Sequence, residues 1–209
     1  KIDNGINTTY PINNNKGEKP YFNSVFALYN GSIVYKCHKT LLPSYDIFDE
    51  DRFFQKNEAF DILEFKGQRI AISICEDLWY DKVLSYKVDP IQKLKELSPD
   101  FMINISASPF DINKMGERFD LVKSAALKMN VPVFYVNQVG GNTDILFDGG
   151  SMVVDNKGVL CDLAPTFKEY LLVSETSRLV QKNKRTISRE GSLIDALVMG
   201  IRDYCQKTR

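Results

Sequence analysis

One cysteine stands where a thiol could act as a nucleophile. Cys75 ends the apolar run 70–74 and is followed at once by Glu76 and Asp77. A residue on the sharp turn at the carboxyl end of a strand is exposed above the sheet, as in nucleophile elbows. The same position also suits a small buried thiol that caps a strand. Local pattern alone favours this structural role.

Two further segments contain groups that could assist a thiol or bind a polar ligand. Lys39 follows another apolar strand, and a lysine near a thiol favours the thiolate and can stabilise an oxyanion. Taken alone, it is better explained as a surface lysine. The run 104–110 leaves an apolar strand into small hydroxyl residues, and Lys114 follows it. A Ser or Asx turn before a helix explains this loop better on local grounds.

Composition excludes several classes of protein. The 209 residues carry 27 basic and 27 acidic side chains, so no broad charge would attract nucleic acid or an anionic membrane. No apolar run approaches the roughly 20 residues that span a bilayer. The single histidine, His38, excludes a His-rich zinc site. Four scattered cysteines without a CxxC pair indicate reduced thiols, so we expect a cytoplasmic protein.

The elements that must position these residues are strands mixed with helices. Asn30-Gly31 and Lys66-Gly67 each separate two strand-like runs and predict hairpins. Helical spacing and apolar runs predict the remaining elements. These are helices at 90–97, 114–129 and 192–205, the last with Ser192 as N-cap, and strands at 101–105, 131–136, 151–154 and 171–173. The pattern indicates an α/β or α+β sandwich whose sheets are not all parallel.

Five segments resemble the nitrilase superfamily of carbon–nitrogen hydrolases, and within it the amidase domains of glutamine-dependent NAD synthetases. In chain order they are KTLLPSYDIFDE (39–50), ICEDLW (74–79), NISASPF (104–110), NQVGGN (137–142) and FDGGS (147–151). The resemblance runs from about residue 21 to residue 176. One such motif would be weak, but five in the family's order with compatible spacing are specific.

The resemblance implies a fold and a domain organisation. The fold would be a four-layer αββα nitrilase-type sandwich. We expect an amidase domain over residues 1–178 that lacks its N-terminal part, and a linker over 179–191. Residues 192–209 would be the first helix of a truncated ATP-dependent synthetase domain. Because the family associates through the amidase domain, the resemblance also implies a homo-oligomer.

The resemblance also implies a Glu-Lys-Cys triad. By position, Cys75 would be the nucleophile and Lys39 the lysine that steadies the oxyanion, helped by the backbone N–H of Glu76. Glu50 would be a further, positioning glutamate. The ends of a glutamine substrate would contact Tyr45, Ser108 and Lys114. The triad glutamate precedes all five segments in the family, and nothing in this sequence stands in its place. We therefore expect this chain alone to lack competent glutaminase activity.

The function that the resemblance implies is hydrolysis of glutamine to release ammonia. A synthetase domain would use the ammonia, with ATP and Mg²⁺, to convert deamido-NAD into NAD, while the amidase part would need no cofactor or metal. One alternative is a free-standing amidase that acts on ω-amides or carbamoyl compounds, against which the final helix argues. The other is a catalytically silent binding module. The joint presence of the cysteine, the lysine and the three substrate residues argues against it.

Overall fold

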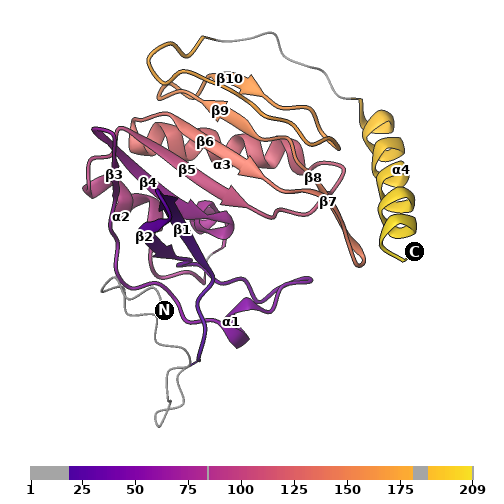
Figure 1. Ribbon diagram of the computed structural model, residues 1–209, viewed down its shortest axis with the longest axis horizontal. Coiled ribbons are helices and arrows are strands. Elements are labelled where there is room, and N and C mark those ends of the chain that lie inside the picture. The colour runs from indigo at the N-terminus through magenta and orange to yellow at the C-terminus, as the bar shows by residue number, and fades with distance from the viewer. Residues whose placement is uncertain (1–18, 84, 181–187, 209) are drawn as a thin grey trace.

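The computed structural model describes residues 19–83, 85–180 and 188–208, and its centre is a six-stranded sheet (Figure 1). The strand order is β10–β9–β6–β5–β4–β3. Strands β4, β5 and β6 run parallel, and the other pairings are antiparallel. The bounds are β3 Leu63–Phe65, β4 Gln68–Ile74, β5 Phe101–Ser106, β6 Val133–Asn137, β9 Met152–Val154 and β10 Leu160–Leu163.

Two further hairpins form small sheets of their own. One joins β1 (Ser24–Tyr29) to β2 (Ser32–His38), and the other joins β7 (Val139–Asn142) to β8 (Ile145–Asp148). Asn30 and Gly31 both take positive φ, 49° and 77°, at the tip of the first. Because a two-residue turn of this kind matches the twist of the flanking strands, these residues set the register next to the turn, which shifts at an irregularity between Ala27 and Leu28.

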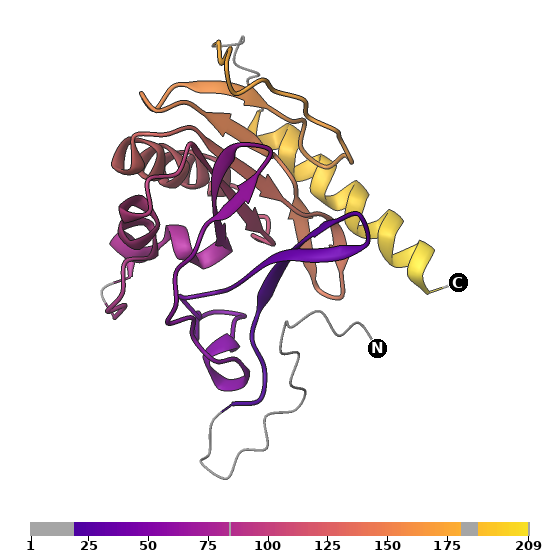
Figure 2. The same ribbon diagram turned by 60° about the vertical axis from the view of Figure 1, so that its left-hand side comes forward.

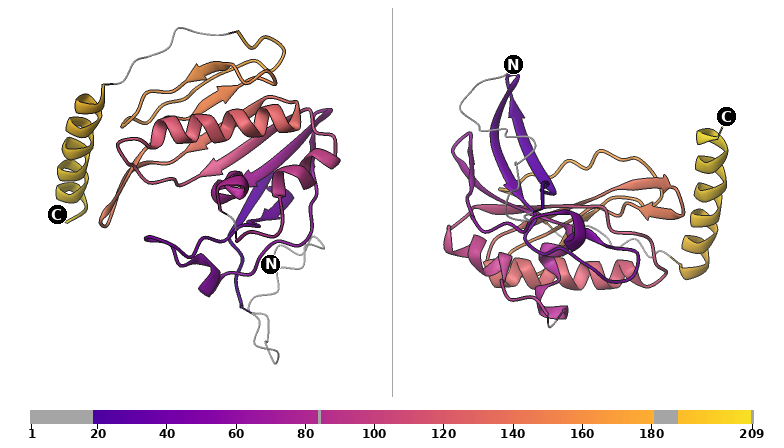
Figure 3. Two further views of the ribbon diagram at one scale, coloured as in Figure 1. Left: turned by 180° about the vertical axis from the view of Figure 1, so that it is seen from behind. Right: turned by 90° about the horizontal axis from the view of Figure 1, so that it is seen from below.

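Helices cover one face of the central sheet, and the β1–β2 hairpin packs on the β3–β4 end of the other face (Figure 3). The covering helices are α2 (Pro90–Glu96) and α3 (Lys114–Met129). Their apolar faces and β4, β5, β6 and β9 form the larger core, which includes Met102, Val122 and Val133. On the opposite face, Tyr35 of β2 packs with Ile70 and Ile72 of β4. The described residues thus supply a helical layer, a sheet and a second, two-stranded sheet.

The remaining helices lie at the margins. They are α1 (Glu50–Phe53), the short 3₁₀ turns η1 (Cys75–Leu78) and η2 (Tyr80–Lys82), and α4 (Arg189–Lys207). Helix α4 lies beside the β7–β8 hairpin (Figure 2), where Ala196 and Met199 pack near Val139 and Leu146. Among the helices of the described ranges, none is both long and apolar enough to cross a bilayer.

The structure confirms most of the predicted elements and corrects two. Both hairpins and the helices at 90 and 114 are present. No strand forms at 171–173, where Leu171 is 84% and Val173 74% exposed, because these side chains have no sheet face to cover. Helix α4 begins at Arg189, since Ser188 rather than Ser192 accepts the capping hydrogen bond. The glycine-rich segment after residue 138, for which the sequence pattern predicted no element, forms β7 and β8. Most of the expected linker, 181–187, lies outside the described residues.

Candidate active site

Cys75 lies on a strained turn at the carboxyl end of β4. Ile74 is still extended, with φ −122° and ψ 115°, whereas Cys75 has φ 40° and begins η1. A positive φ costs a non-glycine residue of order 1 kcal/mol or more and persists only where surrounding contacts impose it. The strain turns this side chain out of the sheet. The predicted nucleophile elbow is therefore present in the backbone.

The surroundings of the Cys75 thiol act on its pKa in opposite directions. Burial raises the pKa, because a thiolate loses hydration, and this effect is the largest. Lys39 opposes it, as do hydrogen bonds from Ser106 and the backbone at Ala107, while Glu76 adds to the rise. Together these effects raise the pKa of the Cys75 thiol. The thiol is thus held mainly in its protonated form, beside a cation that stabilises negative charge when it develops.

Lys39 is a buried cation next to this elbow. It directly follows β2 and its side chain is only 2% exposed. Its ammonium group lies 2.6 Å from Oε1 of Glu50, and the other oxygen of Glu50 accepts from the Asn23 amide at 3.2 Å. Within the described ranges Glu50 is the only hydrogen-bond partner of the ammonium group, which has three protons to donate. The structure thus brings Lys39 against Glu50 and close enough to Cys75 to act on its thiol by charge.

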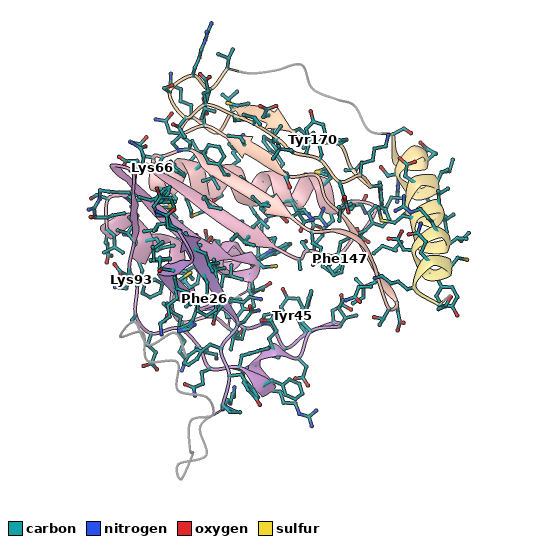
Figure 4. The ribbon with its side chains drawn as sticks, viewed as in Figure 1. Phe26, Tyr45, Lys66, Lys93, Phe147 and Tyr170 are labelled. Atoms are coloured by element: carbon teal, nitrogen blue, oxygen red, sulfur yellow. The ribbon has the colours of Figure 1, made fainter. Side chains whose placement is uncertain are left out.

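A cavity of about 430 Å³ opens above Cys75. Its polar lining includes all three residues predicted to contact a substrate: Tyr45, Ser108 and Lys114. Figure 4 shows Tyr45 on the loop between β2 and α1. Apolar walls come from Trp79, Phe110 and Leu146, among others. The dimensions and the mixed lining suit a small polar molecule with an aliphatic stem.

The three residues predicted to contact the substrate differ in their exposure and in the partners that their side chains already have. The Ser108 hydroxyl is buried, accepts from Arg118 Nε at 3.0 Å, and also forms a hydrogen bond with Tyr135. Lys114 lies over the Trp79 ring, 4.3 Å from its centroid, and pairs with Glu117 at 3.2 Å on the helix surface. Tyr45 is more exposed and donates to a carboxylate within the cavity.

That carboxylate belongs to Glu76, whose side chain the sequence analysis did not single out. Its Oε1 accepts from the hydroxyls of Tyr45 at 2.7 Å and Tyr86 at 2.9 Å. Burial raises its pKa, and the two hydroxyls and Lys39 lower it. The place of Glu76 directly after Cys75 in the sequence could have identified it as a residue of the site. Nothing in the sequence signalled Tyr86, which lies ten residues further along the chain.

A second, larger cavity of about 690 Å³ lies between β7 and α4. Its lining includes Gly141, Arg202 and Asp203, but neither Cys75 nor any of the predicted substrate residues. We place the candidate site in the smaller cavity, because only that one contains a nucleophile with a neighbouring cation. Across the described ranges, no cluster of three or more His, Cys, Asp or Glu side chains could hold a metal ion.

Comparison with known proteins gives consistent matches. The carbon–nitrogen hydrolase family matches residues 3–184. A glutamine-dependent NAD(+) synthetase of Synechocystis is 37% identical over 204 residues, which cover 92% of this chain and 36% of the relative. The corresponding protein of Aquifex aeolicus is 34% identical over 175 residues, 82% of this chain and 30% of its own. The chain therefore spans about a third of the length of these relatives.

Solved structures support the same relationship. The glutamine-dependent NAD+ synthetase of Acinetobacter baumannii, in complex with ADP, superposes with a TM-score of 0.79 at 29% identity. The match covers 88% of this chain and 35% of that one. A carbon-nitrogen hydrolase from Helicobacter pylori G27 superposes with a TM-score of 0.63 at 21% identity, over 71% of this chain and 54% of its own. The second likeness concerns the fold alone.

Proposed function

Because this chain belongs to the carbon–nitrogen hydrolase family and has its nitrilase-type fold, we propose that the Cys75 cavity hydrolyses the side-chain amide of glutamine. One observation carries the proposal. A cysteine on a strained elbow shares its surroundings with a buried lysine that has unused protons, beneath a cavity lined by both acidic and basic groups. This arrangement fits attack on an amide whose substrate also carries an α-ammonium and an α-carboxylate.

The reaction divides into two steps. The Cys75 sulfur attacks the amide carbon, a C–S bond forms, and the carbonyl electron pair moves onto oxygen. The Lys39 ammonium group and the backbone N–H of Glu76 stabilise that oxyanion. Collapse of the intermediate breaks the C–N bond and releases ammonia, which leaves a thioester. Water then attacks the thioester to give glutamate and the free thiol, so one difficult hydrolysis becomes two easier steps.

Proton transfer needs a base that takes the thiol proton and returns it to the leaving nitrogen. Of the carboxylates named above, Glu50 is bound to Lys39 and Glu76 to two tyrosine hydroxyls. We assign the transfer to the triad glutamate that the family resemblance expects outside the five motif segments. Glu50 then acts as the residue that positions Lys39.

The rest of the cavity would orient the substrate. Lys114 is placed to pair with the α-carboxylate of glutamine, and a cation–carboxylate pair of this kind is a strong, directional contact. Glu76 supplies the complementary charge for the α-ammonium group, while Tyr45 and Ser108 offer hydroxyls. Opposite charges at the two ends would favour an amino-acid amide over a simple amide, because an uncharged substrate makes neither of these two charge pairs.

We further propose that the complete protein is a glutamine-dependent NAD synthetase. Several relatives of known function carry that name over matches to 82–92% of this chain. Ammonia from the Cys75 site would pass to a synthetase domain that uses ATP to amidate deamido-NAD. The same proposal places ATP and Mg²⁺ on that synthetase domain. A cytoplasmic homo-oligomer is part of the same proposal.

A glutamine-mimicking diazo ketone tests the proposed chemistry. The protein is incubated with it and analysed by intact mass and peptide mapping. We expect one adduct, on Cys75, suppressed by excess glutamine and absent in Cys75→Ser. The thiols of Cys37, Cys161 and Cys205 provide internal controls, and Cys205 is exposed. Labelling spread over these thiols, or insensitive to glutamine, would remove the basis for the proposal. Protection by a simple amide as strong as that by glutamine would favour a free-standing amidase instead.

A further inference from the structure

We propose that Asp77 is a positioning residue that holds the Lys39 segment and the Cys75 elbow in fixed register. This inference rests on the proposed function, because it concerns how those two groups are brought together. Asp77 follows the nucleophile by two residues, is 2% exposed, and does not line the cavity. It therefore acts through the backbone of its neighbours and not on the substrate.

The carboxylate of Asp77 joins two segments that come from different strands. Oδ1 accepts from the backbone N–H groups of Thr40 at 3.0 Å and Leu41 at 2.9 Å. Oδ2 accepts from the backbone N–H of Ile74 at 3.0 Å. One side chain thus binds both residues that follow Lys39 and the residue that precedes Cys75. Within the described ranges, no other hydrogen bond links residues 39–41 to residues 74–77.

Two features show that this contact determines the local geometry. Thr40 and Leu41 are buried, 4% and 3% exposed, so their N–H groups would have no partner if the carboxylate were removed. Leaving one such group unpaired costs about 1–3 kcal/mol. The Ile74 bond closes the turn on which Cys75 takes its positive φ. Loss of the carboxylate would therefore release the lysine segment and the elbow together.

The charges around Asp77 are few and have opposing effects. Burial raises its pKa to about 6, while the three N–H groups and Lys39 lower it. Asp77 in turn raises the pKa of Cys37 on β2, and the groups that act on Cys75 by charge are Lys39 and Glu76. A charge effect and a positioning effect of Asp77 on the Cys75 thiol have opposite signs. Removal of an anion alone would lower the thiol pKa, whereas a displaced Lys39 would raise it.

The experiment compares Asp77→Asn and Asp77→Ala with the wild-type protein. Asparagine keeps one oxygen for Thr40 and Leu41 but turns a donor toward the Ile74 N–H, whereas alanine removes all three bonds. The apparent pKa of Cys75 is read from the pH dependence of its alkylation by iodoacetamide, located by peptide mapping. We expect it to rise in both variants, further in Asp77→Ala. Labelling by the glutamine mimic should fall by roughly 100-fold in Asp77→Ala, a size typical of small misplacements at a reactive centre.

Val133→Ala serves as the matched control, because it removes buried volume from β6 without touching the site. It should lower stability and leave the Cys75 pKa unchanged. If Asp77→Asn also left the thiol pKa unchanged or lowered it, the positioning role would be refuted. If Cys75 in the wild type does not react with the glutamine mimic, the proposed function is refuted but the positioning role of Asp77 is not. The iodoacetamide profile would still decide the role of Asp77.

Discussion

Two cationic side chains are buried in the described part of the protein, Lys39 and Arg118, and the structure uses them in different ways. Arg118 of α3 donates all five of its N–H groups. Nη1 binds both carboxylate oxygens of Asp148 at 2.7 and 2.9 Å, Nη2 binds the carbonyls of Ser108 and Pro109, and Nε binds the Ser108 hydroxyl. Among the residues that the structure describes, Lys39 donates to one carboxylate oxygen only.

The difference separates a structural cation from one suited to chemistry. A buried donor without a partner is costly, so native structures satisfy such groups unless a site needs them. Arg118 has no donor left for a substrate, and its bonds fix the loop that carries Ser108 to the cavity. Lys39, as far as the described part of the chain shows, has two protons left to offer an oxyanion. Its burial strengthens that interaction, because little water competes.

The largest expected effect is on stability, from Arg118→Met. The substitution leaves the Asp148 carboxylate buried and unpaired, and removing one partner of such a pair costs about 3–5 kcal/mol. The unfolding free energy, measured by urea denaturation at neutral pH, should fall by that amount. A loss below about 1 kcal/mol, the range of exposed pairs, would contradict the structural role.

Lys39→Met should do the opposite of Arg118→Met: it should slow the reaction of Cys75 strongly and change stability little. We expect the rate of Cys75 labelling by the glutamine mimic to fall about 100- to 1,000-fold, the usual effect of losing an oxyanion donor. Stability should change little or rise, because methionine fills the site without a charge to desolvate and Glu50 is still 19% exposed to water. Unchanged labelling with a large loss of stability would place Lys39 in the same class as Arg118.

The pH dependence of Arg118→Met sharpens the comparison. Burial raises the pKa of the Asp148 carboxyl and Arg118 lowers it, so in the variant the pKa should rise further above its unfolded value. A raised folded-state pKa gives stability that is present at low pH and lost as pH rises through that pKa. The difference in unfolding free energy between the wild type and the variant should therefore shrink on acidification from pH 7 to pH 5. Urea midpoints of both proteins at each pH measure it, and a constant deficit would exclude an unpaired Asp148 as the cause.

The smallest effect is expected from Glu50→Gln. Glutamine still offers an oxygen to the Lys39 ammonium group but no charge, so Lys39 is held more loosely. Labelling of Cys75 should slow by roughly tenfold, equivalent to about 1.4 kcal/mol, the lower end for a hydrogen bond to a charged group. Asn23→Ala, which removes only the partner of the other Glu50 oxygen, is the control and should have a smaller effect. If the two variants slowed the labelling of Cys75 equally, Glu50 would act only as a structural hydrogen-bond acceptor and not through its charge.

Much of the architecture was predictable because local rules determined it. The Asn30-Gly31 turn defined one hairpin, and the apolar spacing of 114–129 gave the bounds of α3. The nitrilase-type fold and the family followed from five ordered motifs, and the comparisons confirm both. The strand predicted at 171–173 failed because its apolar side chains have no sheet face to cover: Leu171 is 84% and Val173 74% exposed.

The sequence by itself determined which groups are present near the nucleophile: Cys75, Lys39 and most of the cavity residues lie in recognisable segments. Only the tertiary structure decided what each group can do. The sequence could not reveal that Asp77 binds backbone groups 36 and 37 residues away, or that Tyr86 turns back onto Glu76. Nor could it distinguish the satisfied Arg118 from Lys39. Partners and burial depend on long-range packing, and these set the free donors and the pKa values on which the chemistry depends.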